Sequence, residues 1–276
     1  MRPGEEVHRL TVQGQLERLQ DSNEMTTISI VTAVYNCYQT VGQTLDSVFS
    51  QSYPSIEAIV IDGASTDGSL VAIEKYRSRL GTFISERDDG IYDAFNKGIK
   101  HATGDVIGFL SADDIFENCE ILSKVADVFK DPAVDVVYGD LVYVKHDDIT
   151  KVIRYWRSGL YDDAALRRGW MPPHPTLYVR RSVYQRLGVF DTRYRISADY
   201  DLVLRFLAVG KVRSAYIPEV MVRMRVGGAS NRSLKAIARK SIEDIAALRR
   251  NKVGGVWTLL NKNLRKIRQF WERQRS

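Results

Sequence analysis

Short apolar runs alternate with stretches of helical spacing along the first half of the chain. The apolar runs are rich in β-branched residues, which favour strands, and they read ISIVTAV, EAIVID, TFIS, DVIGFL and VDVVYG between residues 28 and 139. Between them, apolar residues recur every three or four positions, as on one face of a helix. These sets are Val41, Leu45 and Val48; Leu70 and Ile73 with Tyr76 or Leu80; Ile91, Phe95 and Ile99; and Leu122, Val125 and Phe129. The alternation predicts an α/β fold, Rossmann-like, with a mostly parallel sheet that helices cover on both faces.

The pattern becomes less regular beyond Asp140. VKHDDITKVIRYWRSG is polar and aromatic and fits antiparallel strands, WMPPHPTLYVRR places a Pro-rich loop before a strand, and ISADYDLVLRFLAVG predicts an acidic loop that enters an amphipathic helix. Residues 234–250 again have helical spacing. We therefore expect a polar N-terminal arm (1–26), one α/β domain (27–230) with halves at 27–140 and 141–230, and C-terminal helices (231–276).

The composition is that of an ordinary globular protein, with 44% hydrophobic and 27% charged residues in a chain of 276. No apolar run approaches the roughly 20 residues that a membrane span needs, and the N-terminal stretch lacks the apolar core of a secretory signal. Two cysteines, Cys37 and Cys119, are too few for a disulfide framework. We expect two free thiols and a cytoplasmic location.

The net charge of +6 is concentrated at the C-terminus. Residues 251–276 contain seven Lys or Arg and one Glu, so the rest of the chain is close to neutral. This distribution favours an acidic partner for the tail alone, and we expect no nucleic-acid partner. Apolar side chains recur at helical spacing among the basic ones of the tail: Val256, Leu260, Leu264, Ile267 and Trp271, with Trp257 and Phe270 beside them.

A basic amphipathic helix of this kind is typical of peripheral attachment to a membrane. Its aromatic and aliphatic side chains enter the interface and its cations meet anionic lipid, here at the cytoplasmic face of the inner membrane. The alternative is a helix that packs its apolar face on the α/β domain or on a second copy of the chain, as in a homodimer. The sequence leaves both interpretations open.

Polar clusters follow three of the predicted strands. TAVYN ends the first, DGASTDGS follows the second and SADD follows the fourth. Ligands of parallel α/β sheets bind beyond the carboxyl ends of the strands, where such loops meet. The adjacent carboxylates Asp113 and Asp114 repel each other unless water solvates them or a cation lies between them. An acidic turn that caps the next helix explains this pair alone, whereas the neighbouring clusters favour a Mn²⁺ or Mg²⁺ site.

In four ordered motifs the chain resembles family-2 glycosyltransferases of the GT-A fold: ISIVTAVYN, VIDGASTDGS, GIYDAFNKGIKHATGDVIGFLSADD and SADYDLVLR. Within that family it is most similar to bacterial enzymes that assemble surface or extracellular polysaccharide. The resemblance implies transfer of a hexosyl or N-acetylhexosaminyl group from a nucleotide-sugar donor, most often a UDP-sugar, to a hydroxyl of a growing or lipid-linked saccharide. It also makes residues 27–140 the nucleotide-binding half and 141–230 the acceptor-binding half.

Asp62 ends a buried strand before Gly63, where its carboxylate can accept hydrogen bonds from a ribose hydroxyl or from the uracil imide. A turn-forming Asp-Gly pair is the alternative. Family members often have two Asp before this glycine, whereas this chain has one. The resemblance implies further nucleotide contacts from the backbone of Ala33, where the family usually has Pro, and from Tyr35, Asn36, Asp88, Asn96 and Lys97. Lys97 suits a diphosphate as a point charge, or it is a solvated helix lysine.

SADD stands at the place of the family's acidic metal-binding motif, with Ser111 in place of its first Asp. The resemblance assigns the divalent cation to Asp113 and Asp114, and we expect Asp114 to bind it while Asp113 is shared with the ribose. The residue that matches the family's general base is Asp199, which would take a proton from the acceptor hydroxyl. Ala198 stands where the family usually has Glu, and helix capping is the alternative role of Asp199.

Four further residues are predicted near the transferred sugar or the acceptor. They are Trp170, as a stacking platform for a pyranose; His174; Asp201; and Arg225 in the segment MRVGGAS, whose glycines would let it close over the diphosphate together with Ser230. For His174 the alternative is a structural histidine, and for MRVGGAS it is a plain surface turn.

The combined prediction is an inverting, metal-dependent glycosyltransferase. One rival is a nucleotidyltransferase, which shares the α/β layout and the acidic metal ligands. It normally has a Gly-rich basic loop near the first strand, and TAVYNCYQT has none. A second rival is a non-catalytic, membrane-associated module that binds nucleotide sugars.

Overall fold

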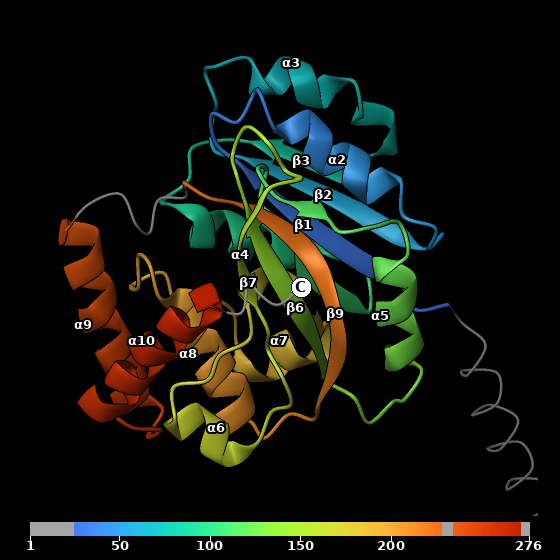
Figure 1. Ribbon diagram of the computed structural model, residues 1–276. Helices are drawn as coiled ribbons and strands as arrows, with labels where there is room; N and C mark the ends of the chain where they lie inside the picture. The colour runs from blue at the N-terminus through green and yellow to red at the C-terminus, as the bar shows by residue number, and fades with distance from the viewer. Residues whose placement is uncertain (1–24, 228–233, 272–276) are drawn as a thin grey trace, which may run out of the picture.

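The computed structural model describes residues 25–227 and 234–271 of the protein. Nine strands in these ranges form one mixed sheet in the order β3-β2-β1-β4-β8-β6-β9-β5, with β7 paired to β6 (Figure 1). The strands are β1 (Ile28–Val34), β2 (Ile56–Asp62), β3 (Thr82–Ser85), β4 (Val106–Phe109), β5 (Ile115–Phe116), β6 (Val136–Val144), β7 (Val152–Trp156), β8 (Tyr178–Arg180) and β9 (Ser214–Arg225). The N-terminal arm predicted over residues 1–26 lies almost wholly outside the described residues.

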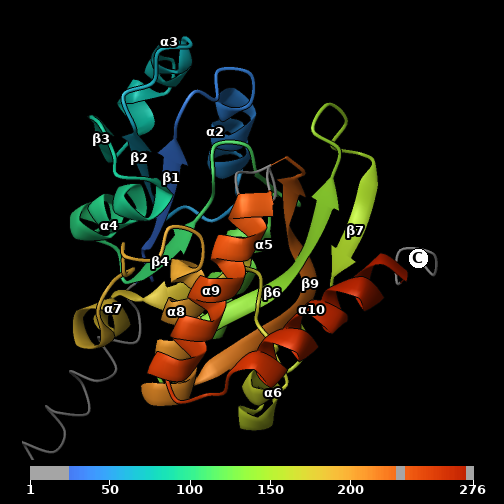
Figure 2. The ribbon, with the colours of Figure 1, turned by 90° about the vertical axis from the view of Figure 1, so that its left-hand side faces the viewer.

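Strands β3, β2, β1 and β4 run parallel, as the alternating pattern predicts. They are joined by α2 (Val41–Phe49), α3 (Ser69–Glu74), the 3₁₀ turn η1 (Arg77–Arg79) and α4 (Ile91–His101), and α5 (Ile121–Phe129) follows β5. Helix α4 packs on one face of these strands, whereas α2, α3 and α5 pack on the other (Figure 2). The predicted α/β fold is confirmed, and Cys37 and Cys119 are free thiols as expected.

The second half of the sheet changes direction at β8, which is antiparallel to both β4 and β6. Strand β6 then pairs in parallel with β9 and antiparallel with β7, so VKHDDITKVIRYWRSG contributes an antiparallel strand as predicted. The predicted boundary at residue 140 falls inside β6. Both halves of the domain therefore share one continuous sheet.

The remaining helices gather beside this second half. They are α6 (Asp163–Arg167), the 3₁₀ turn η2 (His174–Thr176), α7 (Arg181–Leu187), α8 (Ala198–Leu204) with the π-helical turn η3 (Arg205–Val209), α9 (Leu234–Arg250) and α10 (Val256–Trp271). Helix α9 packs on α8, and α10 packs on α9 and β7 (Figure 2). Within the described ranges, no helix is long and apolar enough to span a membrane.

Helix α10 forms where the tail pattern predicts it, but it packs with a different face. Its buried side chains include Leu259 and Lys262, and a β-carbon at Gly169 would overlap the backbone of Lys262, so the helix lies directly against that glycine. The predicted apolar stripe faces outward instead, with Trp257 81% and Leu264 59% exposed. The side chains of Ile267, Phe270 and Trp271 lie outside the described ones.

Candidate active site

The polar clusters predicted at the strand ends meet at one edge of the sheet. Val34, at the end of β1, pairs in register with Asp62 at the end of β2, and Gly63 N donates to Val34 O (2.9 Å). Ala112 N donates to Ala33 O (3.2 Å), which brings the SADD turn against the end of β1. The three clusters therefore form one continuous rim at the carboxyl ends of parallel strands.

Asp62 is fully buried at this rim. Its Oδ2 accepts hydrogen bonds from Ser65 N (3.0 Å) and Ser85 Oγ (2.7 Å), which hold the turn after β2. Its Oδ1 has no hydrogen-bond partner in the described part of the chain. A buried oxygen without a donor is unfavourable. Asp62 thus fits both the turn-forming role and the nucleoside-binding role. One oxygen holds the turn after β2, and the other can accept a hydrogen bond from a ribose hydroxyl or a nucleobase.

The loops after β1 and β2 are tied together at Asn36. This residue has a left-handed backbone (φ 51°), its N–H donates to Ser65 Oγ (2.9 Å), and its Oδ1 accepts from Thr66 N (2.9 Å). Its side chain therefore supports the loop. Tyr35 is 66% exposed, and a β-carbon at Gly63 would lie 3.3 Å from its ring. Tyr35 thus offers an aromatic face at the place where we expect the nucleobase of the donor.

Lys97 lies in a cage of acidic groups, which differs from its predicted role at the diphosphate. Its Nζ is 2.6 Å from Asp88 Oδ1, 2.8 Å from Glu86 Oε1 and 3.4 Å from Asp93 Oδ2. Burial alone would lower the pKa of Lys97, but the hydrogen bonds that it donates to Asp88 and Glu86 raise this pKa above its usual value. Its charge is already balanced, so Lys97 mainly fixes Asp88, whose carboxylate borders Gly63.

Asn96 and Trp170, predicted to contact the nucleotide and the sugar, make their contacts within the protein interior. Asn96 Nδ2 donates to Phe190 O (2.9 Å) and its Oδ1 accepts from Phe190 N (3.0 Å), so both ends of the amide are used. Trp170 is 3% exposed, packs edge-on against Tyr138, and donates from Nε1 to Ser158 O (2.7 Å). An indole buried in this way leaves no face on which a pyranose can stack.

The two carboxylates of the SADD turn have different environments. Asp113 is half-buried, whereas Asp114 is fully buried and neither of its oxygens has a hydrogen-bond partner among the described residues. Burial raises the pKa of Asp114 well above its usual value, the charge of Asp113 raises it further, and Arg225 opposes both effects. A buried carboxyl group without donors is unfavourable, and a divalent cation that prefers oxygen ligands would relieve it. The pair therefore fits the predicted cation.

The protein offers a cation few other ligands at this place. In residues 25–227 and 234–271 no group of three or more His, Cys, Asp or Glu side chains gathers as a metal-binding cluster. Mg²⁺ and Mn²⁺ in phosphate-binding sites commonly take only one or two carboxylates, with water and phosphate oxygens completing the shell. The two carboxylates of the SADD turn suit that kind of site.

Arg225, at the end of β9, lies against the same turn and is 3% exposed. Its guanidinium group donates to Asp113 O, to Gln43 Oε1 and to His146 O (3.2 Å). These three contacts hold Arg225 against the acidic pair, whereas its predicted role is to close over the diphosphate. Ser230, which we expected to move with it, lies outside the described residues.

Asp199 lies in the first turn of α8 and is half-buried. Its Oδ1 accepts from Tyr200 N (2.8 Å) and from the Tyr92 hydroxyl (3.1 Å), which belongs to α4. Asp201, two residues further, is fully buried and accepts from Asn251 Nδ2 (2.9 Å). Asp201, predicted near the acceptor, thus contacts Asn251, and Asp199 is the more exposed of the two carboxylates.

His174 is enclosed by aromatic rings near the end of β4. Its ring packs against Phe109 of β4 (5.2 Å between centroids) and against Phe190 (5.4 Å), and its Nε2 has no hydrogen-bond partner in the described structure. Burial lowers the pKa of His174, and the charge of Asp199 opposes this shift. His174 thus contacts the end of the strand that leads into the SADD turn and lies close enough to Asp199 to feel its charge.

Two residues that contact the segment 195–199 were not predicted from the sequence. Tyr92 lies one helical turn before Asn96 in GIYDAFNKG, and this spacing could have indicated that both face the segment before α8. Glu243 accepts from the backbone N–H groups of residues 195–197. It lies far away along the chain, on a helix without a family motif, so no signal in the sequence could have identified it.

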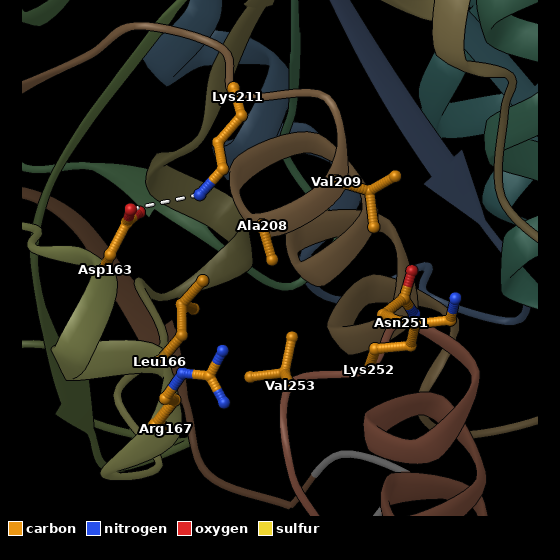
Figure 3. A pocket seen from close by; sticks show the side chains of 9 residues that line it. All are labelled: Asp163, Leu166, Arg167, Ala208, Val209, Lys211, Asn251, Lys252 and Val253. Carbon is orange, nitrogen blue, oxygen red and sulfur yellow. Dashed lines mark hydrogen bonds and ion pairs between the residues drawn. The ribbon is translucent and has the colours of Figure 1, made fainter.

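A separate cavity of about 280 Å³ lies between α6, η3 and the turn that joins α9 to α10 (Figure 3). Its lining includes Arg167, Lys211 and Lys252, and Lys211 pairs with Asp163 (3.0 Å). The residues of the strand-end rim are not part of this lining. The cavity is therefore distinct from the candidate site.

Comparisons with known proteins identify the family and the fold of this chain. The model of the family described as glycosyl transferase family 2 matches residues 29–196. The PGL/p-HBAD biosynthesis glycosyltransferase of Mycobacterium bovis (strain BCG / Pasteur 1173P2) is 29% identical over 208 residues, which cover 74% of this chain and 78% of that protein. The putative glycosyltransferase EpsE of Bacillus subtilis (strain 168) is 28% identical over 204 residues, with 72% of each chain covered.

Solved structures of glycosyltransferases have the same fold. S. aureus TarS 1–349 matches with a TM-score of 0.61 at 19% identity, and the match covers 82% of this chain and 64% of that one. The mannosyltransferase PcManGT from Pyrobaculum calidifontis, solved with GDP-Man and Mn²⁺, matches with a TM-score of 0.61 at 19% identity over 88% and 74% of the two chains. The fold is thus GT-A, and this chain spans about two thirds of the TarS fragment. Because the family model covers more than half of the sequence, the chain belongs to glycosyl transferase family 2.

Proposed function

We propose that this protein is an inverting glycosyltransferase that uses a UDP-sugar donor, a divalent cation at Asp113 and Asp114, and Asp199 as general base. The buried Asp114 carboxylate without a donor is the observation that supports the cation most directly. In the proposed site Tyr35 flanks the nucleobase of the donor, Asp62 Oδ1 accepts a hydrogen bond from the nucleoside, and the half-buried Asp113 faces the diphosphate. A bound cation would neutralise the charge of the departing nucleoside diphosphate.

The proposed reaction is a single displacement. Asp199 takes the proton of the acceptor hydroxyl while the acceptor oxygen attacks the anomeric carbon. The bond between that carbon and the β-phosphate oxygen breaks at the same time, and the nucleoside diphosphate leaves with the electron pair. Attack from the side opposite the leaving group inverts the anomeric configuration.

The proposed donor is a UDP-hexose or a UDP-N-acetylhexosamine, as the family resemblance implies. S. aureus TarS 1–349, whose fold this chain shares, has been solved in complex with UDP-GlcNAc. The Pyrobaculum enzyme is in complex with GDP-Man, so a guanosine donor is the alternative that an experiment must include.

The proposed acceptor is a lipid-linked saccharide at a membrane surface. The outer face of α10, formed by Val256, Trp257, Leu260 and Leu264, is exposed and apolar. The tail that contains it is rich in Lys and Arg. A helix with exposed aromatic and aliphatic side chains among cations binds well at the interface of an anionic bilayer.

Donor hydrolysis tests the proposed function. The intact protein is incubated with UDP-glucose, UDP-galactose, UDP-GlcNAc or GDP-mannose, with and without Mn²⁺, and the release of nucleoside diphosphate and of pyrophosphate is measured. We expect release of UDP from at least one UDP-sugar only when Mn²⁺ is present. Release of pyrophosphate would indicate a nucleotidyltransferase, and cation-dependent binding without any release would indicate a non-catalytic module.

A further inference from the structure

Three consecutive backbone N–H groups just before Asp199 donate to one carboxylate. Glu243, on α9, accepts from Arg195 N (3.1 Å) through Oε1, and from Ile196 N (2.8 Å) and Ser197 N (3.0 Å) through Oε2. These residues lead directly into α8, where a negative charge is also favoured by the helix dipole. Glu243 therefore fixes the stretch of backbone that carries Asp199.

Tyr92 fixes the same segment from α4. Its hydroxyl lies 2.7 Å from Ile196 O and 3.1 Å from Asp199 Oδ1. Burial raises the pKa of Tyr92 well above its usual value, and the charge of Asp199 raises it further. The hydroxyl thus stays protonated and shares its one proton between two acceptors. A donor in this place restricts the rotation of the Asp199 carboxylate.

The helix that carries Glu243 is itself held in place by α10. Lys262 Nζ lies 2.9 Å from Asp244 Oδ2 and 3.2 Å from the centroid of the Tyr200 ring. Lys262 and Asp244 are both buried, and a buried ion pair of this kind is strongly unfavourable to break. Lys262 therefore connects α10 both to α9 and to Tyr200, the residue that follows Asp199.

We propose that Glu243 and Tyr92 are positioning residues for Asp199, so that the C-terminal helices take part in the reaction by orienting the base. This proposal rests on the proposed role of Asp199. Both side chains contact the Asp199 segment, and neither belongs to the strand-end rim assigned to the nucleotide. A misplaced base slows proton transfer and leaves donor binding intact, because the base acts on the acceptor or on water.

The test measures Mn²⁺-dependent UDP release, with water as acceptor, in the intact protein and in Glu243→Gln, Tyr92→Phe, Asp199→Asn and the two double variants that contain Asp199→Asn. Glu74→Gln, at an exposed position of α3, is the control for loss of a glutamate charge. We expect Glu243→Gln and Tyr92→Phe each to lower kcat by roughly 10- to 100-fold, with the donor KM close to that of the parent and a thermal midpoint lowered by the loss of their hydrogen bonds. Each double variant should be no slower than Asp199→Asn alone, because the positioning residues act only through the base.

The outcomes separate the two proposals. Parental kcat in Glu243→Gln and Tyr92→Phe, combined with low kcat in Asp199→Asn, would overturn the positioning role and leave the base assignment intact. Parental kcat in Asp199→Asn would overturn the base and the positioning role together. A further loss in the double variants would show action independent of Asp199 and would also overturn the proposal. If Glu243→Gln does not fold, the Tyr92→Phe variant alone tests the positioning role. This variant should fold, because a phenylalanine ring can keep the stacking contact with Phe190.

Discussion

Asp113 and Asp114 are neighbours in sequence, yet only Asp113 is partly exposed to solvent. We therefore propose that Asp113 contacts the cation from the solvent side and Asp114 contacts it from the buried side. Asp113→Asn and Asp114→Asn should each lower Mn²⁺-dependent UDP release by roughly 100-fold or more, since a cation at the leaving group contributes several kcal/mol. Calorimetric titration with UDP and Mn²⁺ should show loss of cation-dependent binding in at least one variant. If both bind like the parent, the cation is held elsewhere.

Asp199→Asn is expected to bind the donor like the parent and to lose transfer, because a general base contributes little to nucleotide affinity. UDP titration and UDP release measure the two properties separately. Asp127→Asn, at an exposed position of α5, is a matched control that should behave like the parent. Once an acceptor is known, NMR of the product should show inversion at the anomeric carbon, and retention would contradict a single displacement.

Sequence motifs located the residues that follow strand ends or begin a helix, such as Asp62, the acidic pair and Asp199. Such positions are visible because a hydrophobic pattern shows where a strand stops. The motifs did not show how Asn96 and Lys97 are used. Their side chains meet groups that tertiary packing brings to them, and no local pattern encodes those partners.

Strands and helices with a strong period were predicted close to their observed bounds, and α9 spans the predicted residues 234–250. Strand β6 is the main difference, since it continues past Gly139 to Val144. A glycine inside a strand pattern often marks a bulge or a close approach of another group, and the register of β6 with β9 shifts between Tyr138 and Asp140. Here the glycine makes room for Met221 of β9, because a β-carbon at Gly139 would overlap that side chain.

The inward face of α10 could not be predicted from its own sequence. A lysine on an amphipathic helix normally marks the exposed side, yet Lys262 is buried because Asp244 of α9 supplies its counter-charge. Val256, Leu260 and Leu264 of the predicted stripe are thereby turned to the surface. A helical wheel defines two faces, and only the neighbouring helix decides which of them is covered.

Asp191 links the loop before α8 to α9, and this contact predicts a pH dependence. Its carboxylate pairs with Arg193 (2.6 Å) and with Arg250. The hydrogen bonds from Arg193 lower its pKa well below the usual value of 3.8, burial opposes this shift, and Arg250 lowers the pKa further. Since the folded pKa is below the unfolded one, the ionised carboxylate stabilises the fold above about pH 4. That contribution is lost as the pH falls toward the folded pKa.

Asp191→Asn should therefore lower the free energy of unfolding by about 1 kcal/mol at neutral pH, a modest value because both arginines are partly exposed. Urea denaturation near pH 7 and near pH 3 measures the difference between variant and parent. The difference should shrink at the lower pH. An equal difference at both pH values would mean that the contact does not depend on the charge of Asp191.

The C-terminal helices belong both to the folded core and to the outer surface of the protein. Truncation after Asn251 would remove Lys262 and leave the buried Asp244 carboxylate without its counter-charge. Removal of one partner of a buried ion pair lowers the free energy of unfolding by about 3–5 kcal/mol. Such a truncation is expected to destabilise the whole domain. It cannot separate membrane binding from folding, so substitutions on the outer face of α10 are the appropriate test.

The outer face of α10 is expected to bind anionic membranes. The intact protein should sediment with vesicles of phosphatidylglycerol and phosphatidylcholine at low salt. Added salt should weaken this binding, because the screening length falls from about 30 Å at 0.01 M to about 8 Å at 0.15 M. Insertion of Trp257 and Leu264 should supply the apolar part, since an apolar side chain of this size contributes about 1.5–3 kcal/mol when it leaves water.

The double variant Trp257→Ser/Leu264→Ser should lower the vesicle partition constant by about tenfold or more, since each factor of ten corresponds to about 1.4 kcal/mol. Its thermal midpoint and donor hydrolysis should match the parent, because both side chains are exposed. Leu160→Ser, at a leucine that is 81% exposed outside α10, is the matched control and should bind vesicles like the parent. Equal partition of the double variant and the parent would remove the membrane role. A change from dimer to monomer without lipid would instead show that this face joins two copies of the chain, because the same apolar stripe can be covered by a protein surface as well as by a bilayer.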